Sequence, residues 1–486
     1  MAPGLLFFFV LAYFALLMGV AWRTSRHADN DSFFIGNKSS NWMLVAFGMV
    51  GTSLSGVTFI SVPGAVAHDG FTYFQIILGQ FLGYLVIAFV LLPLYYRFNL
   101  TSIYRYLDAR LGRRTYLTGA SFFILSRTLG ATARLYLVVR ILQDAILDGL
   151  AVPFWLTTLV ILGMILLNTY QGGVKTIVWT DTLQTSCMLL GLVICVAYVL
   201  SSLHLTPFES WQQMQARGIA TVFTTDVDSR LFFGKQIFAG MFIAIAMTGL
   251  DQEMMQKTIS VKTLRDSQKN ILVLSAIMLL VVLLFLFLGG LLTLYAPTVG
   301  VTAGGDKLFA SVVLGHLPGF VQIIFIIALI SALFPSADGA ITALTSSFCI
   351  DILGIQRRAL PEAVRTRTRH RVHLGFAALF LALIMVFKWA DNPSMIGLIL
   401  KLAGYTYGPL LGLFAFGILT RRIVNDRFVP AIAIAAPIAC FFIDKYQSVL
   451  FGKYEIGLEL LIINGALTFA GLWLASSPRA VRTAHA

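Results

Sequence analysis

Residues 48–58 read GMVGTSLSGVT, a run of small and hydroxyl side chains in the middle of the apolar stretch 42–66. Such a run packs poorly against lipid, so it belongs inside a bundle of helices. Two interpretations stay open. The run can form a tight helix crossing, because small residues let two backbones approach closely. It can also interrupt its helix, because a broken helix is tolerated at mid-membrane where a cavity or protein receives its backbone groups.

The rest of the chain predicts such a bundle. Hydrophobic residues make up 58% of the 486 residues and charged residues 12%, with a mean hydropathy of +0.85. A bilayer-spanning helix needs about 20 mainly apolar residues. Apolar windows predict an all-α polytopic membrane protein of about 13 helices, near residues 4–22, 42–66, 71–96, 115–146, 152–170, 176–203, 231–250, 270–295, 318–350, 372–389, 393–419, 428–446 and 456–477.

The distribution of charge predicts the orientation. If the N-terminus lies outside, about 24 of the 35 Lys and Arg residues, Lys257 among them, fall in inner loops and the C-terminal tail. Cytoplasmic loops are enriched in these residues, so we expect the C-terminus inside. The net charge of +13 is explained by these loops, which leaves nucleic-acid binding without support. Polar connections are too short for a soluble domain, so residues 1–486 are expected to form one domain of the cell membrane.

Ionisable residues inside the windows are the functional candidates, because a charge at mid-membrane is costly unless it faces a polar interior. Asp338 lies in the ninth window and Asp181 in the sixth, where an interfacial, solvated carboxylate is the alternative. Arg127 and Arg134 are two helical turns apart and share one face. An arginine keeps its proton. Each therefore needs an anionic partner, either a solute carboxylate held bidentately or a structural partner such as Asp181, Asp338 or a backbone carbonyl.

Oxygen-bearing side chains are also concentrated in the ninth window. Residues 331–340 read SALFPSADGA and are followed by further hydroxyl residues. Hard cations prefer carbonyl, hydroxyl and carboxylate oxygens. Residues 48–58 and 331–340 offer such oxygens and no soft ligands, so together they fit a site for an alkali cation.

Short motifs follow one another along nearly the whole chain: DSFFIGNK at 31–38, Trp42, TSIYRYL at 101–107, Gly172-Gly173, WTD at 179–181, GLDQ at 249–252, Gln256-Lys257 and YTYGPLLGLF at 405–414. In this order they resemble the sodium:solute symporter family, which includes sodium/galactose, sodium/proline and sodium/sialic acid transporters. The resemblance implies Na⁺-coupled symport of a small solute by alternating access. It also implies a LeuT-like core of two inverted five-helix repeats, 42–203 and 231–419, with an extra helix at 4–22 and two more at 428–477. A second broken helix is expected near residues 239–249.

The resemblance also assigns the ion sites. The family's main Na⁺ site would consist of the carbonyls of Gly51, Leu54 and Ala332 and the hydroxyl of Ser336. Pro335 stands where the family commonly has a second hydroxyl, and proline has neither a hydroxyl nor an N–H group.

The second cation site of some relatives would involve Asp181 and the adjacent positions Asp338 and Gly339. Two carboxylates there could hold one cation, or one of them could carry a proton at neutral pH. A proton-coupled or uncoupled carrier is therefore the alternative to Na⁺ coupling.

The solute is expected at the break in the second window. Its predicted contacts are Ser53, Ser55, Thr58, Phe59, Gln75, Arg127 and Arg134. The two arginines favour a carboxylate-bearing solute, and a neutral sugar stays possible. Besides the solute, the expected partner is the lipid bilayer.

Two other classes of protein are disfavoured. An intramembrane enzyme needs a catalytic set, but the histidines fall in loops, at termini or near predicted helix ends, without an HExxH or paired-cysteine pattern. A transporter-like sensor is expected to carry a signalling domain, and the chain continues for only about ten residues after its last window. The chain is thus predicted not to be an enzyme.

Overall fold

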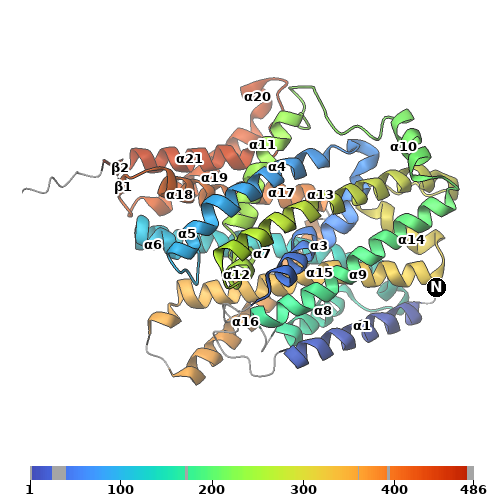
Figure 1. The fold of residues 1–486 in the computed structure, drawn as a ribbon, viewed down its shortest axis with the longest axis horizontal. Coiled ribbons are helices and arrows are strands. Elements are labelled where there is room, and N and C mark those ends of the chain that lie inside the picture. The colour runs from blue at the N-terminus through green and yellow to red at the C-terminus, as the bar shows by residue number, and fades with distance from the viewer. Residues whose placement is uncertain (1–2, 25–39, 170–172, 359–360, 391–393, 479–486) are drawn as a thin grey trace, which may run out of the picture.

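The computed structural model describes residues 3–24, 40–169, 173–358, 361–390 and 394–478, and most of these residues are helical (Figure 1). The predicted all-α fold is confirmed. The motif at residues 31–38 and Gly172 lie outside the described residues, as does the end of the C-terminal tail.

The described residues of the first half of the chain form nine α-helices. They are α1 (Pro3–Thr24), α3 (Trp42–Asp69), α4 (Tyr73–Val86), α5 (Leu92–Arg97), α6 (Arg105–Arg110), α7 (Arg113–Leu142), α8 (Phe154–Thr169), α9 (Gly173–Ser202) and α10 (Pro207–Ala216). A π-helical turn, Ile87–Leu91, joins α4 to α5.

The second half contains the remaining helices and two short strands. The helices are α11 (Phe233–Ala244), α12 (Gln252–Ile259), α13 (Leu264–Tyr295), α14 (Leu308–His316), α15 (Gly319–Ser347), α16 (Glu362–Ala390), α17 (Met395–Thr406), α18 (Gly408–Leu419), α19 (Val429–Lys445), α20 (Gln447–Phe451) and α21 (Leu460–Leu474). Strand β1 (Ile423–Val424) pairs with β2 (Ser476–Ser477) in antiparallel fashion.

Many of these helices can cross a bilayer. Among the described residues, eight spans are long and apolar enough, and the bent pairs α11–α12 and α17–α18 raise the number to 10 if each pair is one span. Helices α8 and α21 are apolar but shorter. Each predicted window contains a helix or a bent pair. The count of thirteen, the orientation of the termini and the division into repeats stay predictions.

Helix α16 differs most from its predicted bounds. It begins at Glu362 rather than near residue 372, because the intervening arginines are good helix formers and extend the helix beyond the apolar window. His373 therefore lies inside the helix and not near its end. It is buried and makes hydrogen bonds with the hydroxyls of Thr169, at 2.9 Å, and Thr345, at 3.0 Å.

Helix α3 is broken within the run that the sequence singles out. Ser55 has φ 51° and ψ 164°, in the left-handed range of φ that residues other than glycine rarely adopt. The glycines beside it pack tightly, because a Cβ on Gly56 would lie 2.4 Å from Val138 Cγ2. The run is thus both a break and a close crossing.

A second break separates α11 from α12. A π-helical turn, Ile245–Gly249, ends α11, and the two helices differ in direction by 66°. Asp251 caps α12, since its Oδ1 accepts hydrogen bonds from the backbone N–H groups of Glu253, at 2.9 Å, and Met254, at 3.2 Å. The break lies at the end of the range predicted for it, residues 239–249.

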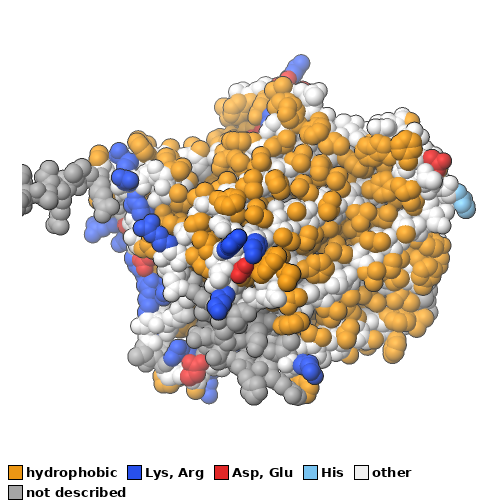
Figure 2. Space-filling model, viewed as in Figure 1, with side chains coloured by type: hydrophobic (Ala, Val, Ile, Leu, Met, Phe, Trp, Pro, Cys, Tyr) orange, Lys and Arg blue, Asp and Glu red, His pale blue; other side chains and the backbone are white. Residues whose placement is uncertain are grey.

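Burial separates inner helices from outer ones. The most apolar windows of α3 and α15 are each 78% buried, against 33% for α1 and 28% for α16. In Figure 1, α1 lies at the lower edge of the bundle. Figure 2 shows hydrophobic side chains over the broad face of the molecule, while Lys and Arg gather mainly toward the end where α6 and the two strands lie.

Candidate functional site

The break in α3 opens onto a small cavity of about 90 Å³. Apolar residues of α11, α13 and α17 form much of its wall. The polar residues come mainly from α3, α4 and α7: Thr52, Ser53, Ser55, Thr58, Gln80, Arg127 and Arg134. An apolar pocket with a few convergent polar groups is typical of a small-molecule site.

Two of the predicted solute contacts do not line this cavity. Phe59 is fully buried, and its ring packs on Phe285 and Phe309 with centroids 5.6 and 5.3 Å away. Gln75 Nε2 donates a hydrogen bond to the Leu231 carbonyl at 3.2 Å. Both side chains join neighbouring segments of the bundle, whereas the other five predicted contacts do line the cavity.

The two arginines of α7 have different surroundings. Arg127 Nη2 donates a hydrogen bond to Glu253 Oε2, and its Nη1 lies 3.9 Å from Asp251 Oδ2. Arg134 makes no ion pair or hydrogen bond with another described residue, although it lines the same cavity. The structural partners expected for these arginines were Asp181, Asp338 or a backbone carbonyl, yet Arg127 pairs with acids of the second broken helix.

A buried charge cluster lies next to the cavity; it consists of Arg127, Asp181, Asp251, Glu253 and Lys257, each at most 3% exposed. Lys257 Nζ lies 2.8 Å from Asp181 Oδ2 and 3.7 Å from Glu253 Oε1. The hydroxyl of Tyr407 donates to Asp251 Oδ2 at 2.6 Å. Burying charges is costly unless they are paired, and each member of the cluster has a partner of opposite charge.

Asp338 lies on α15, fully buried near this cluster. Its Oδ2 accepts a hydrogen bond from Asn168 Nδ2 at 3.1 Å, and its Oδ1 accepts from the Gly339 N–H at 2.6 Å. It also interacts electrostatically with Asp181 and Lys257. The two predicted carboxylates therefore belong to one charged region, but the cation in contact with Asp181 is a side chain of the protein itself.

The predicted main Na⁺ site lies where α3 crosses α15. A Cβ on Gly51 would approach Thr185 Oγ1 to 2.4 Å and Pro335 Cγ to 3.5 Å. Ser336 is buried and donates a hydrogen bond to the Leu333 carbonyl at 2.9 Å. Thr185 Oγ1 is buried without a hydrogen-bond partner among the described residues. The described residues contain no group of three His, Cys, Asp or Glu side chains suited to a metal ion. The ligands predicted here are instead backbone carbonyls and a hydroxyl.

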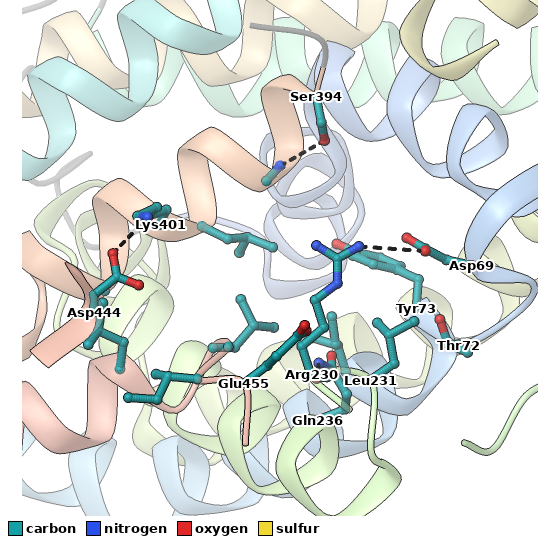
Figure 3. Close-up of a pocket in the computed structure, with 18 of the residues that line it drawn as sticks. Asp69, Thr72, Tyr73, Arg230, Leu231, Gln236, Ser394, Lys401, Asp444 and Glu455 are labelled. Atoms are coloured by element: carbon teal, nitrogen blue, oxygen red, sulfur yellow. Dashed lines mark hydrogen bonds and ion pairs between the residues drawn. The ribbon is translucent and has the colours of Figure 1, made fainter. Parts of the chain in front are cut away.

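A larger cavity of about 860 Å³ adjoins the small one, and Figure 3 shows the residues that line the larger cavity. Charged side chains surround it in pairs: Arg230 Nη2 lies 3.8 Å from Asp69 Oδ1, and Lys401 Nζ lies 2.7 Å from Asp444 Oδ2. Tyr73, Ile396 and Leu400 line both cavities. These three side chains thus lie between the larger cavity and the small cavity at the break.

The model of the sodium:solute symporter family matches residues 33–427 of this chain. The chain belongs to the sodium:solute symporter family. It is similar to the sodium/sialic acid symporter SiaT of Proteus mirabilis (strain HI4320), with 22% identity over 93% of this chain and 92% of the relative. Sodium-coupled monocarboxylate transporter 1 of Mus musculus is 25% identical, over 80% of this chain and 64% of the relative.

A solved structure of a Na⁺-coupled sialic acid symporter in a substrate-bound outward-open state has the same fold. Its TM-score is 0.82 at 17% identity, with 97% of this chain and 98% of that chain covered. The predicted family, the LeuT-like fold class and the coupling ion Na⁺ are confirmed. The symporter is a multi-pass membrane protein that transports a small-molecule solute. It is a transporter and not an enzyme.

Sequence reasoning missed the partners inside the buried charge cluster of this symporter. Lys257 was expected in an inner loop, but it lies in α12 and is 3% exposed. The signal was present: Asp251, Glu253 and Lys257 share a short segment directly after the apolar window 231–250. Because the chain bends by 66° there, α12 packs inside the protein and its charges become buried.

Proposed function

We propose that this symporter carries a small carboxylate-bearing solute together with Na⁺ across the cell membrane by alternating access. The observation that carries the proposal is the environment of Arg134, which faces the cavity. Among the described residues no acid forms an ion pair or hydrogen bond with it, and Glu253 and Asp251 act on it only from a distance. Arg127 and Lys257 each form an ion pair with an acid. A partly buried guanidinium in an apolar pocket is stabilised by an anion, and a carboxylate fits it bidentately.

Hydroxyl groups at the break complete the proposed solute site. Ser53 Oγ is buried near the hydroxyl of Tyr84 and makes no hydrogen bond of ordinary length with a described residue, and Ser55 and Thr58 line the same cavity. A solute that accepts or donates hydrogen bonds there relieves the cost of unpaired buried polar atoms. The volume of about 90 Å³ is small beside the roughly 300–1,000 Å³ of pockets for drug-sized ligands, which favours a solute of few atoms.

The names of the relatives support an acidic solute. The Proteus mirabilis protein is a sialic acid symporter and the mouse protein a monocarboxylate transporter. Sialic acid carries a carboxylate, as a monocarboxylate does. The small cavity favours a carboxylate with few atoms for this chain.

The proposed ion site consists of the carbonyls of Gly51, Leu54 and Ala332 and the hydroxyl of Ser336. Thr185 Oγ1 is adjacent to Gly51 and has no hydrogen-bond partner among the described residues, so it can supply the oxygen that Pro335 lacks. Helix α3 then contributes to both sites, because Leu54 lies between Ser53 and Ser55. Na⁺ and solute would each raise the affinity for the other by the same factor, a coupling typically of about 1–3 kcal/mol.

A thermal-shift measurement on purified protein tests the solute class. Short carboxylic acids are compared with their uncharged amides, in Na⁺ and in K⁺. A carboxylate that binds only the folded state raises the melting temperature, and we expect this response in Na⁺ alone. Arg134→Gln should lose it, whereas Arg140→Gln, on the same helix but outside the cavity, should keep it. An amide that stabilises the native protein and Arg134→Gln equally would contradict the proposal.

The ion site is tested by the Na⁺ concentration that gives half-maximal stabilisation. Thr185→Val and Ser336→Ala should each raise this concentration several-fold, because each removes one oxygen ligand. Thr180→Val is the control, since the hydroxyl of Thr180 on the same helix is bonded to backbone carbonyls of that helix. A Na⁺ response that is identical in all three variants would exclude the site.

A further inference from the structure

We propose that the ammonium group of Lys257 is a tethered cation that takes the place of a second coupling ion, so that this symporter binds one Na⁺ per transport cycle. The inference rests on the main Na⁺ site proposed above and concerns a different region, around Asp181. Its basis is the set of oxygens around Lys257, the space beside Gly339 and the connection to the solute cavity.

The oxygens around Lys257 Nζ are of the kinds that coordinate hard cations. Thr52 Oγ1 and Asp181 Oδ2 each lie 2.8 Å from Nζ, and Glu253 Oε1 lies 3.7 Å away. A hydroxyl and carboxylates are also preferred ligands of hard cations. Because Nζ already carries a positive charge and contacts these oxygens, a free ion at the same position would be repelled by it.

Gly339 provides the space that this arrangement needs. A Cβ at this position would lie 2.4 Å from Glu253 Oε1 and 3.0 Å from Lys257 Nζ. Any larger side chain on α15, including one with a hydroxyl suited to an ion, would therefore displace the two charged groups. The adjacent Asp338 uses its oxygens to accept hydrogen bonds from Asn168 and from the Gly339 N–H. The residues on this turn of α15 thus accommodate the lysine rather than a free cation.

Lys257 also connects this region with the solute cavity. Glu253 interacts with both Arg127 and Lys257, and both Arg127 and Thr52 line the cavity. The ion pairs therefore join α7, α12 and α9 beside the break in α3. A fixed charge at this junction supplies the electrostatic connection that a second bound ion would otherwise make, without being transported.

Equilibrium binding of ²²Na⁺ to the purified full-length chain tests the proposal, because it counts ions independently of transport. We expect one Na⁺ for the native protein. Lys257→Ala leaves Asp181 unpaired and opens the space around it, so a second Na⁺ should bind and the Hill coefficient for Na⁺ should rise from about 1 toward 2. Lys257→Arg retains the charge and should bind one.

The double variant Lys257→Gln/Asp181→Asn removes both charges and should also bind one Na⁺. Two ions bound to the native protein would overturn the proposal, as would a single ion bound to folded Lys257→Ala. If Lys257→Ala does not fold, Lys257→Gln, which keeps Asp181 and removes the charge, replaces it: two bound ions support the proposal and one overturns it. No Na⁺ bound to the native protein would instead refute the main ion site, so the two failures are distinguishable.

Discussion

The buried charge cluster and the solute cavity share one helix, α7, but differ in how their charges are paired. Arg127 and Arg134 lie on the same face two turns apart. Glu253 and Asp251 lie within ion-pair distance of Arg127, whereas they act on Arg134 only from a distance. The difference arises from α12, which the second break brings beside Arg127. We therefore expect Arg127, which the broken helix pairs directly, to be structural, and Arg134, which has no direct ion pair, to be available to a ligand.

Removing Glu253, the counter-charge that Arg127 and Lys257 share, is the strongest test of this difference between the two regions. Glu253→Gln should destabilise the protein by about 3–5 kcal/mol, because both Arg127 and Lys257 lose a buried partner. The melting temperature in detergent measures this effect. Arg134→Gln removes a charge that makes no ion pair with a described residue, and it should change the melting temperature of the solute-free protein by much less.

A double-mutant cycle separates charge from packing. If the loss in Glu253→Gln reflects an unpaired arginine, Arg127→Gln in the same background should restore part of the stability. Equal melting temperatures for Glu253→Gln and Arg134→Gln would show that pairing does not distinguish the two regions.

Packing around the cluster can be probed from α15. Gly339→Ala should cost about 1–3 kcal/mol, as expected for overpacking a filled site, because its Cβ would press on Glu253 Oε1 and Lys257 Nζ. Gly130→Ala on α7 is the matched control, since nothing lies within 4 Å of the added Cβ. Alanine there should be neutral or stabilise by about 0.5–1 kcal/mol through helix propensity. Similar melting temperatures for the two variants would mean that the space beside Gly339 is not filled.

Much of the fold could be predicted from the sequence, because membrane helices depend on local properties. Apolar windows located the helices, and the run at residues 48–58 located the break at Ser55. The arginine pair on α7 also followed from helical spacing. Which arginine is paired could not be predicted, because the answer depends on the 66° bend between α11 and α12. For the same reason Lys257 was assigned to a loop, although its segment packs inside the bundle.

The lining of the cavity at the break was predicted less completely for a related reason. Ser53, Ser55 and Thr58 line the cavity because they surround the break itself. Phe59 follows directly in the sequence but points away, toward an aromatic cluster contributed by other helices. Side-chain direction just beyond a break depends on the new helix axis, which no local pattern specifies.

The smallest change in stability is expected at the ion pair of Lys401 and Asp444, whose geometry is nearly the same as that of the buried pair of Lys257 and Asp181. Lys401 Nζ lies 2.7 Å from Asp444, close to the 2.8 Å between Lys257 and Asp181, but the Lys401 side chain is 56% exposed. Water already solvates this lysine, and Asp444 keeps a hydrogen bond from Tyr405 at 2.8 Å. Lys401→Gln should therefore change stability by about 0–1 kcal/mol, and the difference should shrink further as salt screens the pair. A loss as large as that of Glu253→Gln, measured as a melting temperature at low and high salt, would mean that burial is not what separates the two regions.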